Sequence, residues 1–394
     1  MTPSARISAA IEVLDKIRAG AAAEQALINW GRRSRFAGSS DRAALRDLVF
    51  DVLRRWRSCA VLGGGESGRA LIVGALRGQG IDPDTVFTGE GYGPAILTAP
   101  ERMSGERPEG PAALDLPDWL WPRFEAALGD RAAPTAEALR HRAPVMLRVN
   151  LRRGRPADAI LRLANDGILA RPCTIARTAL HVTGGERKIS RSSAYLDGLV
   201  ELQDGSSQAA MERLTLVPGS RVLDFCAGGG GKTLALAGRE HAQWFAQDVA
   251  PERMADLPLR AARAGVEVQV LDRASVRAKA PFDLVLCDAP CSGSGTWRRT
   301  PEAKWRLRPE RLAELAAVQA QILDEAAALV AVGGRLAYAT CSVLTEENQD
   351  IVSRFESKNV GWTLIEQIKW PVSGCGDGFF LAQFCRSDSA GIQP

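Results

Sequence analysis

The sequence predicts an α/β protein whose C-terminal half forms a doubly wound, mostly parallel sheet, preceded by an all-α region. Three observations predict it. From Asp204 onward, short apolar runs alternate with amphipathic helical stretches, the pattern of repeated βαβ units. Several of these runs end at an aspartate. Before about Leu97, apolar residues recur only at helical spacing.

The first predicted region, residues 1–98, is helical. Ile7, Ile11, Leu14 and Ile17 recur at helical spacing, and Leu45–Trp56 follows a strong i, i+3, i+4, i+7 pattern. Arginines cluster near the end of this second helix, where cations suit the helix dipole. They could equally contact RNA phosphates, so the pattern leaves a structural and an RNA-binding role open.

A basic segment follows a predicted linker. Residues 99–117 are rich in Pro, Gly, Glu and Arg, and residues 118–203 read as a mixture of strands and helices. Between Leu139 and Ser193 there are 12 Lys or Arg against 3 Asp or Glu, although the whole chain carries a net charge of only +4. Arginine suits phosphate, so this segment is expected to contact RNA. A GC-rich genome would also enrich arginine without any function. Charge alone does not decide between RNA binding and this compositional bias.

The C-terminal region, residues 204–386, carries the α/β pattern, and 387–394 is expected to be a flexible tail. Strands are predicted at Arg221–Phe225, Gln243–Gln247, Val266–Leu271, Phe282–Cys287, Arg335–Thr340 and Gly378–Phe384. Helices are predicted at Lys232–Gly238, Pro251–Gly265 and Pro309–Val330.

Composition excludes several classes. No apolar run is long enough to span a bilayer, and the N-terminus lacks a signal-peptide layout, so a cytoplasmic protein is expected. Eight cysteines, only three histidines and no C-x-x-C motif argue against a metal site and against structural disulfides. A monomer without membrane partners is expected, although no pattern speaks directly to oligomeric state.

The glycine loop Asp224–Thr233, DFCAGGGGKT, fails two familiar nucleotide motifs. A phosphate-binding loop requires glycine five residues before Gly231, and that position is Cys226. A dinucleotide fingerprint beginning at Gly228 requires glycine where Thr233 stands.

Acids at successive strand ends favour a nucleoside cofactor that lacks phosphate. Asp248 can accept hydrogen bonds from ribose hydroxyls, and Asp272 can reach an adenine edge. Together with Asp224 and Asp288 they follow four consecutive strands. Each aspartate alone is more often a helix cap, but four in succession are hard to assign to capping. S-adenosylmethionine fits this pattern.

Two cysteines at strand ends suggest covalent chemistry. Cys291 follows Asp288-Ala289-Pro290, and Cys341 ends another apolar run. A thiolate that attacks carbon 6 of cytosine makes carbon 5 nucleophilic enough to accept a methyl group. Either cysteine could be this nucleophile on chemical grounds, and Asp288 is placed to meet the N3/N4 edge of the base. Trp297, Trp305 and Phe379 could stack on the base, with core packing expected for two of the three.

These motifs together resemble the RsmB/Nop2/Sun family of RNA 5-methylcytidine methyltransferases, most closely its bacterial RsmB branch. The matching segments are Gln203–Gln208, Asp224–Thr233, Asp248 with Arg253, Asp288–Ser292, Arg299–Trp305, Ala339–Ser342, Glu346–Asn348 and Gly376–Phe380. The N-terminal region is similar, more loosely, to the family's NusB-like RNA-binding domain.

The resemblance implies a Rossmann-like S-adenosylmethionine methyltransferase domain that methylates carbon 5 of a cytidine in ribosomal RNA, with small-subunit (16S) RNA expected. It assigns covalent attack to Cys341, product release to Cys291 and base recognition to Asp288. The implied cofactor-binding residues are Cys226, Ala227, Gly228, Gly229, Gly230, Gly231, Lys232, Asp248, Arg253, Asp272 and Asp288. A tRNA or DNA cytosine methyltransferase and a non-catalytic assembly factor are the alternatives.

One departure from the family pattern lies in the glycine loop. Gly228 and Gly229 replace the usual Ala-Pro. Each additional glycine is expected to cost about 0.4–1 kcal/mol of loop ordering, which would weaken cofactor binding without abolishing it.

Overall fold

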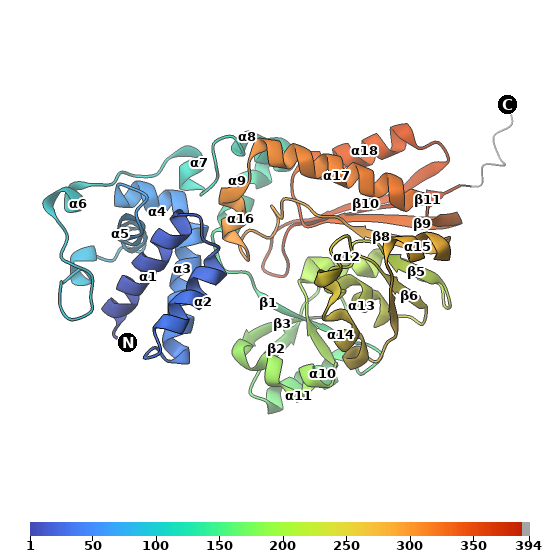
Figure 1. Cartoon of the computed structure of the whole chain (residues 1–394), viewed down its shortest axis with the longest axis horizontal. Helices are drawn as coiled ribbons and strands as arrows, with labels where there is room; N and C mark the ends of the chain where they lie inside the picture. Colours follow the sequence, from blue (N-terminus) through green and yellow to red (C-terminus); the bar gives the residue numbers. More distant parts are fainter. Residues whose placement is uncertain (388–394) are drawn as a thin grey trace. The chain divides into compact units, whose positions relative to one another are not determined.

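The computed structural model describes residues 1–387 and divides into two compact units (Figure 1). Unit 1 contains Met1–Arg142 together with Trp297–Leu307, and unit 2 contains Ala143–Thr296 and the chain from Arg308 onward. Apart from Ser387, the predicted tail 387–394 lies outside the described residues. No helix of the described part is long and apolar enough to cross a membrane.

Unit 1 is helical throughout the part that the structure describes. Its α-helices are α1 (Pro3–Arg18), α2 (Ala23–Arg33), α3 (Ser39–Arg54), α4 (Trp56–Gly63), α5 (Gly68–Gly78), α6 (Ala99–Met103), α7 (Gly110–Ala113), α8 (Trp121–Leu128), α9 (Ala132–Leu139) and α16 (Pro301–Arg306). The apolar faces of α1, α3 and α5 meet in one core. The predicted helix through Trp56 is divided, because Arg55 leaves helical geometry between α3 and α4.

The helical unit continues past residue 98, where the first domain was predicted to end. Residues of the predicted linker are bound to it: the Ser58 amide and hydroxyl donate to the fully buried Asp115 carboxylate at 2.8 and 2.9 Å. Further along, Phe124 of α8 stacks on Trp297 with ring centroids 5.9 Å apart. Tertiary contacts between residues distant in sequence therefore set this boundary.

The segment Trp297–Leu307 contains the whole RTPEAKW motif, Arg299–Trp305, and is anchored inside unit 1. Lys304 is 1% exposed, and burial lowers its pKa to about 7. Its Nζ donates to the Arg54 carbonyl at 3.2 Å, and Trp305 Nε1 donates to the Leu53 carbonyl at 2.7 Å. Trp297 is fully buried. Both tryptophans thus have packing roles in this unit.

Unit 2 begins with a small antiparallel sheet in the order β2-β3-β1-β4. Its strands are β1 (Val145–Val149), β2 (Leu169–Pro172), β3 (Ala179–Gly184) and β4 (Val200–Leu202), with α10 (Pro156–Asn165) and α11 (Ser193–Leu196) between them. Leu147, Leu163 and Leu180 form its core. This is the mixture of strands and helices predicted for the basic segment.

The large sheet has seven strands in the order β10-β11-β9-β8-β5-β6-β7. They are β5 (Arg221–Asp224), β6 (Gln243–Ala246), β7 (Val268–Val270), β8 (Phe282–Asp288), β9 (Val330–Thr340), β10 (Trp362–Trp370) and β11 (Phe379–Arg386). β9, β8, β5, β6 and β7 pair in parallel, while β11 is antiparallel to both β9 and β10. The predicted mostly parallel α/β sheet is confirmed.

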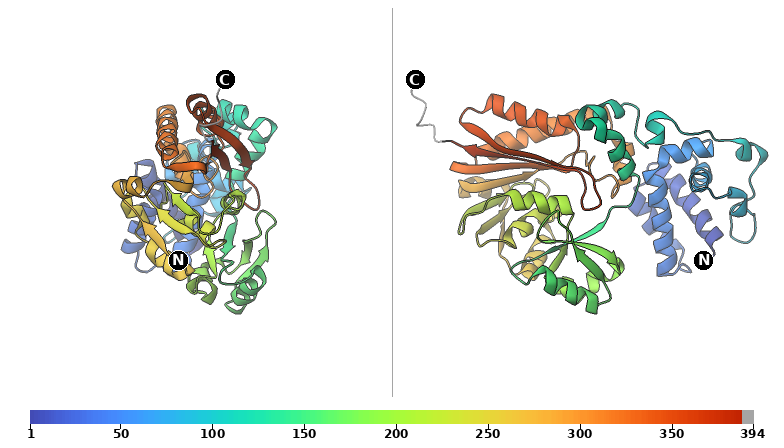
Figure 2. Two further views of the ribbon diagram at one scale, coloured as in Figure 1. Left: turned by 90° about the vertical axis from the view of Figure 1, so that its right-hand side faces the viewer. Right: turned by 180° about the vertical axis from the view of Figure 1, so that it is seen from behind.

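Helices cover both faces of this sheet (Figures 1 and 2). They are α12 (Gly205–Arg213), α13 (Gly231–Ala237), α14 (Leu257–Ala264), α15 (Arg273–Lys279), α17 (Pro309–Ala327) and α18 (Gln349–Lys358). Residues of α12, α13 and α14 share one apolar cluster, and residues of α15, α17 and α18 share the other. On β8, Val285 belongs to one cluster and Leu286 to the other, as expected for a strand buried on both faces.

Three elements differ from or add to the prediction. The helix expected over Pro251–Gly265 is broken into a 3₁₀ turn, Pro251–Met254, and α14, whose second residue is Pro258. α15 has a single buried apolar residue, Val276, so its sequence carried no helical periodicity. The edge strand β10 alternates between exposed and half-buried positions, a pattern too weak to predict a strand.

Candidate active site

The two candidate cysteines lie on loops that leave neighbouring parallel strands. In the β8–β9 register, Asp288 is opposite Ala339, and the Ala289 amide donates to the Ala339 carbonyl at 2.9 Å. Cys291 and Cys341 follow within three residues of these positions. Their sulfur atoms are 3.3 Å apart, and both side chains are partly exposed. The structure therefore brings together two thiols that are 50 residues apart in sequence.

The surroundings make the two thiols unequal. The hydrogen bond from Cys291 lowers the pKa of Cys341, and the nearby Lys232 ammonium and Thr296 hydroxyl act in the same direction against burial and Asp288. The same hydrogen bond raises the pKa of Cys291, with burial adding to it. Cys341 is thus the better thiolate of the pair, and the thiolate is the reactive form.

Replacing Cys291 with alanine should raise the pKa of Cys341, because the hydrogen bond that stabilises its thiolate is lost. Alkylation of Cys341 by iodoacetamide, followed by mass spectrometry from about pH 6 to about pH 10, should then reach half its maximal rate at higher pH than in the parent protein. Cys385→Ala is the control, since Cys385 lies on β11 away from the pair. A midpoint that stays or falls would contradict this ordering of the thiols.

Lys232 and Asp288 form an ion pair beside Cys341. Burial alone would lower the pKa of Lys232, but the Asp288 carboxylate outweighs it and the pKa is raised. The Lys232 Nζ also lies 5.2 Å from the centroid of the Phe379 ring. Phe379 itself is buried beside Trp370. Lys232 therefore remains a cation next to the reactive thiol.

The glycine loop joins β5 to α13 and requires glycine at two of its positions. Gly230 has φ +75°, and a Cβ there would lie 2.2 Å from Leu257 Cδ1. Gly228 has φ +49°, a conformation that costs other L-residues roughly 1–2 kcal/mol. The loop-ordering cost predicted for the additional glycine at position 228 is thus offset, because glycine adopts this positive φ without strain. Gly229 has no positive φ, so its predicted cost is not offset in this way.

Three side chains outside the predicted set of cofactor-binding residues, those of Arg148, Gln203 and Arg260, hold the backbone of the loop. Arg148 Nη1 donates to the Gly231 carbonyl at 2.8 Å and to Gln203 Oε1 at 2.6 Å, and Gln203 Nε2 donates to the same carbonyl at 3.2 Å. Arg260 donates to the Gly229 carbonyl. Arg148 is 5% exposed, so this member of the basic segment supports the loop. A lone arginine inside the apolar run of β1 was the available signal.

The strand-end acids have distinct environments. Asp224 is buried, which raises its pKa to about 6 against the hydrogen bond from Thr233 Oγ1 at 2.7 Å. Asp248 is also buried and accepts the Gly228 amide at 2.8 Å, with Arg253 Nη1 at 3.2 Å. Asp272 is exposed and caps α15 through the Ser275 amide at 2.7 Å. Capping thus accounts for Asp272 in part, and the hydrogen bond from Ser275 lowers its pKa.

This edge of the sheet suits S-adenosylmethionine. Asp224 Oδ1 is buried without a hydrogen-bond partner among the described residues, so an acceptor is left for a donor group of a ligand. After Asp224 the chain continues through Cys226 and Ala227 to Gly228, whose amide donates to the Asp248 carboxylate. Acids at the strand ends and backbone groups of the glycine loop match a cofactor that carries an amine and ribose hydroxyls.

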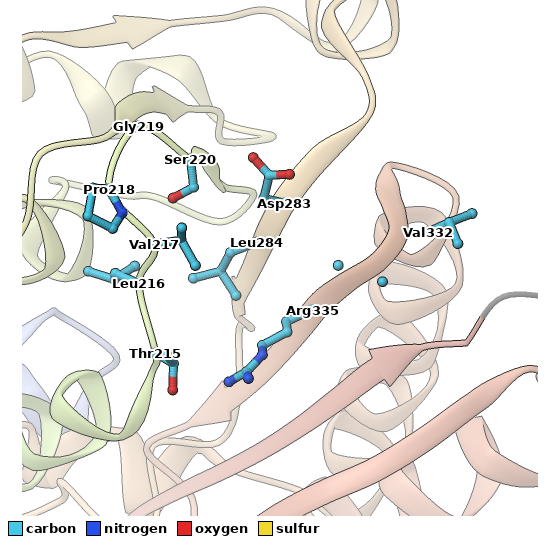
Figure 3. Close-up of a pocket in the computed structure, with 12 residues that line it drawn as sticks. Thr215, Leu216, Val217, Pro218, Gly219, Ser220, Asp283, Leu284, Val332 and Arg335 are labelled. Carbon is cyan, nitrogen blue, oxygen red and sulfur yellow. The ribbon is translucent and has the colours of Figure 1, made fainter.

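Other hollows lie away from this edge. A pocket of about 470 Å³ is lined by residues 215–220 and by Asp283 and Arg335 at the amino ends of β5, β8 and β9 (Figure 3). It contains neither the strand-end acids nor the cysteines. Among the described residues, no three His, Cys, Asp or Glu side chains group as metal ligands would.

The fold and the site define a class: S-adenosylmethionine-dependent methyltransferases with a mostly parallel seven-stranded sheet. Comparison with known proteins narrows it. Residues 211–385 match the family model described as 16S rRNA methyltransferase RsmB/F, and residues 116–187 match the RsmF/B-like ferredoxin-like domain. The chain belongs to the RsmB/F family.

Individual relatives agree with this assignment. The chain is 32% identical over 284 residues to ribosomal RNA small subunit methyltransferase B of Serratia proteamaculans, covering 68% of this chain and 66% of the relative. It spans between 56% and 66% of the length of the first curated relatives it matches.

Solved structures share the fold. The crystal structure of PH0851 matches with a TM-score of 0.74 and 24% identity, covering 98% of this chain and 99% of that one. NSun6 from Pyrococcus horikoshii, solved with SFG, matches with a TM-score of 0.61 and 17% identity, covering 70% of this chain and 99% of that one.

Proposed function

We propose that this chain transfers a methyl group from S-adenosylmethionine to carbon 5 of a cytidine in small-subunit ribosomal RNA. The observation that carries the proposal is the pair of thiols 3.3 Å apart at the ends of β8 and β9, beside the Lys232–Asp288 ion pair and the glycine loop. A single thiol would suffice for attack on the base. A second thiol at this distance suits a reaction in which a covalent adduct must also be released.

The cofactor would be held at the glycine loop. Asp248 and Asp272 would accept its ribose and adenine groups, Arg253 supports Asp248, and residues 226–231 present backbone groups. When bound, S-adenosylmethionine supplies an electrophilic methyl group.

The reaction begins with Cys341. Its thiolate adds to carbon 6 of the cytosine, and the electron pair displaced from the C5–C6 double bond makes carbon 5 an enamine carbon that can take the methyl group. Asp288 lies on the strand next to Cys341 and is the acid placed to hold the N3/N4 edge of the ring. Lys232 keeps Asp288 in place and stabilises the Cys341 thiolate before attack.

Release of the product requires loss of the carbon-5 proton and cleavage of the bond between sulfur and carbon 6. Cys291 lies within 3.3 Å of Cys341 Sγ and, with its raised pKa, carries a proton at neutral pH. It can therefore pass this proton to the departing Cys341 sulfur, and the Cys291 thiolate that results can take up the carbon-5 proton as the C5–C6 double bond re-forms. We assign product release to Cys291 for this reason.

Ribosomal RNA is proposed as the substrate on two grounds. The curated relatives are named ribosomal RNA small subunit methyltransferases. In addition, Arg152 and Arg155 of the basic segment are exposed, as expected for contacts with phosphates. A cytosine within a folded RNA must leave its stack to reach the thiols, so a loop or a flipped nucleotide is the expected target. The helical unit 1, proposed to be NusB-like, would add RNA-binding surface.

The test is methyl transfer by the full chain from labelled S-adenosylmethionine to small-subunit ribosomal RNA, offered both naked and as assembled particles. The expected result is methyl incorporation at one cytidine, which bisulfite sequencing locates. RNA from the parent organism is already methylated at that cytidine and should take up no label. The RNA acceptor comes from a strain lacking the gene. Label entering tRNA or DNA in preference would replace the proposed substrate with one of the alternatives.

A non-catalytic assembly factor is distinguished by cofactor binding. Calorimetry should detect S-adenosylmethionine binding to the chain, and Asp248→Ala should abolish it because Asp248 also holds the Gly228 amide. A chain that binds RNA but not the cofactor would favour the assembly role.

A further inference from the structure

A buried carboxylate joins the two cysteine loops. Glu347 is fully buried and follows β9 by seven residues. Its Oε1 accepts the Ser292 amide at 2.7 Å, and its Oε2 accepts the Ser292 and Ser342 hydroxyls, each at 2.5 Å. Ser292 follows Cys291 and Ser342 follows Cys341. One carboxylate therefore binds the residue next to each thiol.

A second buried side chain completes this arrangement. Gln319 of α17 donates through Nε2 to Glu347 Oε1 at 3.0 Å and to the Pro290 carbonyl at 2.9 Å. Pro290 precedes Cys291, so the cysteine loop is held on both sides of the thiol. Gln319 is itself fully buried. The loop thus owes its position to groups that solvent does not reach.

Neighbouring residues fix the other cysteine loop in the same way. Ser294 and Ser342 share a hydrogen bond of 2.9 Å between hydroxyls, and Ser294 Oγ accepts the Val343 amide at 2.9 Å. Asn348 Nδ2 donates to the Ser342 carbonyl at 3.0 Å. The Tyr338 hydroxyl donates to the Glu347 carbonyl at 2.6 Å, which fixes the backbone of Glu347 itself.

Stability alone does not account for a carboxylate here. Among the described residues no cation pairs with Glu347, and taking an ionised group out of water is costly unless every oxygen is satisfied. Apolar side chains of similar volume usually fill such a space as well or better. Glu347 instead accepts hydrogen bonds from four donors in three segments, the two cysteine loops and α17. These hydrogen bonds fix the positions of the two loops.

We propose that Glu347 is a positioning residue that holds Cys291 and Cys341 at the separation needed for attack and release. The expected effect on catalysis rests on the proposed function, whereas the expected effect on the spacing of the two thiols does not. Glu347 is fully buried, and its side chain is hydrogen-bonded to the residues beside the thiols. It acts through Ser292 and Ser342.

The geometry can be measured without RNA by using phenylarsine oxide, a trivalent arsenical that bridges two thiols only when they are close. The background is Cys375→Ser, because Cys173 and Cys375 form the other hydrogen-bonded thiol pair. In this background, Cys291→Ala and Cys341→Ala are each tested as single substitutions. The arsenical uptake that either one abolishes is the uptake by the Cys291–Cys341 pair. Glu347→Gln should slow that uptake at least tenfold, since a glutamine amide nitrogen cannot accept the serine hydroxyls.

Two further variants keep the test decisive. Glu366→Gln is the matched control, because Glu366 accepts a glutamine Nε2 at 2.8 Å in the same unit but on β10, away from the cysteines. It should take up the arsenical at the parent rate. If Glu347→Gln does not fold, Ser342→Ala removes one donor only and should still slow uptake several-fold. Parent-like uptake in every folded variant of Glu347 and Ser342 overturns the proposal.

A kinetic measurement separates positioning from simple destabilisation. Glu347→Gln should lower kcat for methyl transfer at least tenfold while the affinity for S-adenosylmethionine, measured by calorimetry, stays within twofold. Loss of cofactor affinity in parallel with kcat would indicate general damage and count against positioning. If the parent chain transfers no methyl group at all, the proposed function fails, while the arsenical result still decides the role of Glu347.

Discussion

Cys341→Ala should lose methyl transfer by at least on the order of 10³-fold, because it removes the thiolate proposed to form the bond to carbon 6 that activates carbon 5. Cys341 has the lowered pKa of the pair and follows β9 next to the Lys232–Asp288 ion pair. Alanine removes the sulfur and leaves the small space it occupied, so the fold should persist. The measurement is incorporation of labelled methyl groups into small-subunit ribosomal RNA.

The control is Cys385→Ala, which removes a thiol from β11 and should leave the rate unchanged. The thermal unfolding midpoint of both variants should stay within a few degrees of the parent, and S-adenosylmethionine should still bind to Cys341→Ala. Turnover retained in the folded Cys341→Ala protein would remove Cys341 from the nucleophile role.

Cys291→Ser should accumulate a covalent protein–RNA adduct. A serine hydroxyl is far less acidic than a thiol, so elimination of Cys341 from the methylated base should slow while attack continues. The 3.3 Å separation of the two sulfur atoms places Cys291 against the bond that must break. A heat-denatured gel with labelled RNA should show a slow species that nuclease converts to free protein.

The double variant Cys291→Ser, Cys341→Ala is the matched control and should form no adduct, since the attacking sulfur is absent. If Cys341→Ser forms the stable adduct and Cys291→Ser does not, the two cysteines exchange roles. Asp288 and Lys232 would then need to be reassigned as well.

Much of the fold was readable because its signals are local. β8 is a continuous apolar run, and the strand-to-helix alternation from β5 to β9 follows from apolar spacing alone. The elements that were not predicted lack such signals: α15 has one buried apolar residue and β10 is an edge strand. The segment Trp297–Leu307 could not be assigned to the helical unit from its sequence, because its buried partners, such as Leu53, lie about 250 residues away.

The candidate site divides in the same way. The residue types and their positions after the strands could be predicted from local sequence: Asp288, Cys291 and Cys341, and the glycine loop with its acids. Which thiol carries the lower pKa could not be predicted in this way, because it depends on tertiary contacts of Cys341 with Cys291, Lys232 and Thr296. The tertiary structure also placed Arg148 against the loop and Glu347 between the cysteines. A buried polar contact depends on which segments pack together, so spacing along the chain does not show which groups will meet.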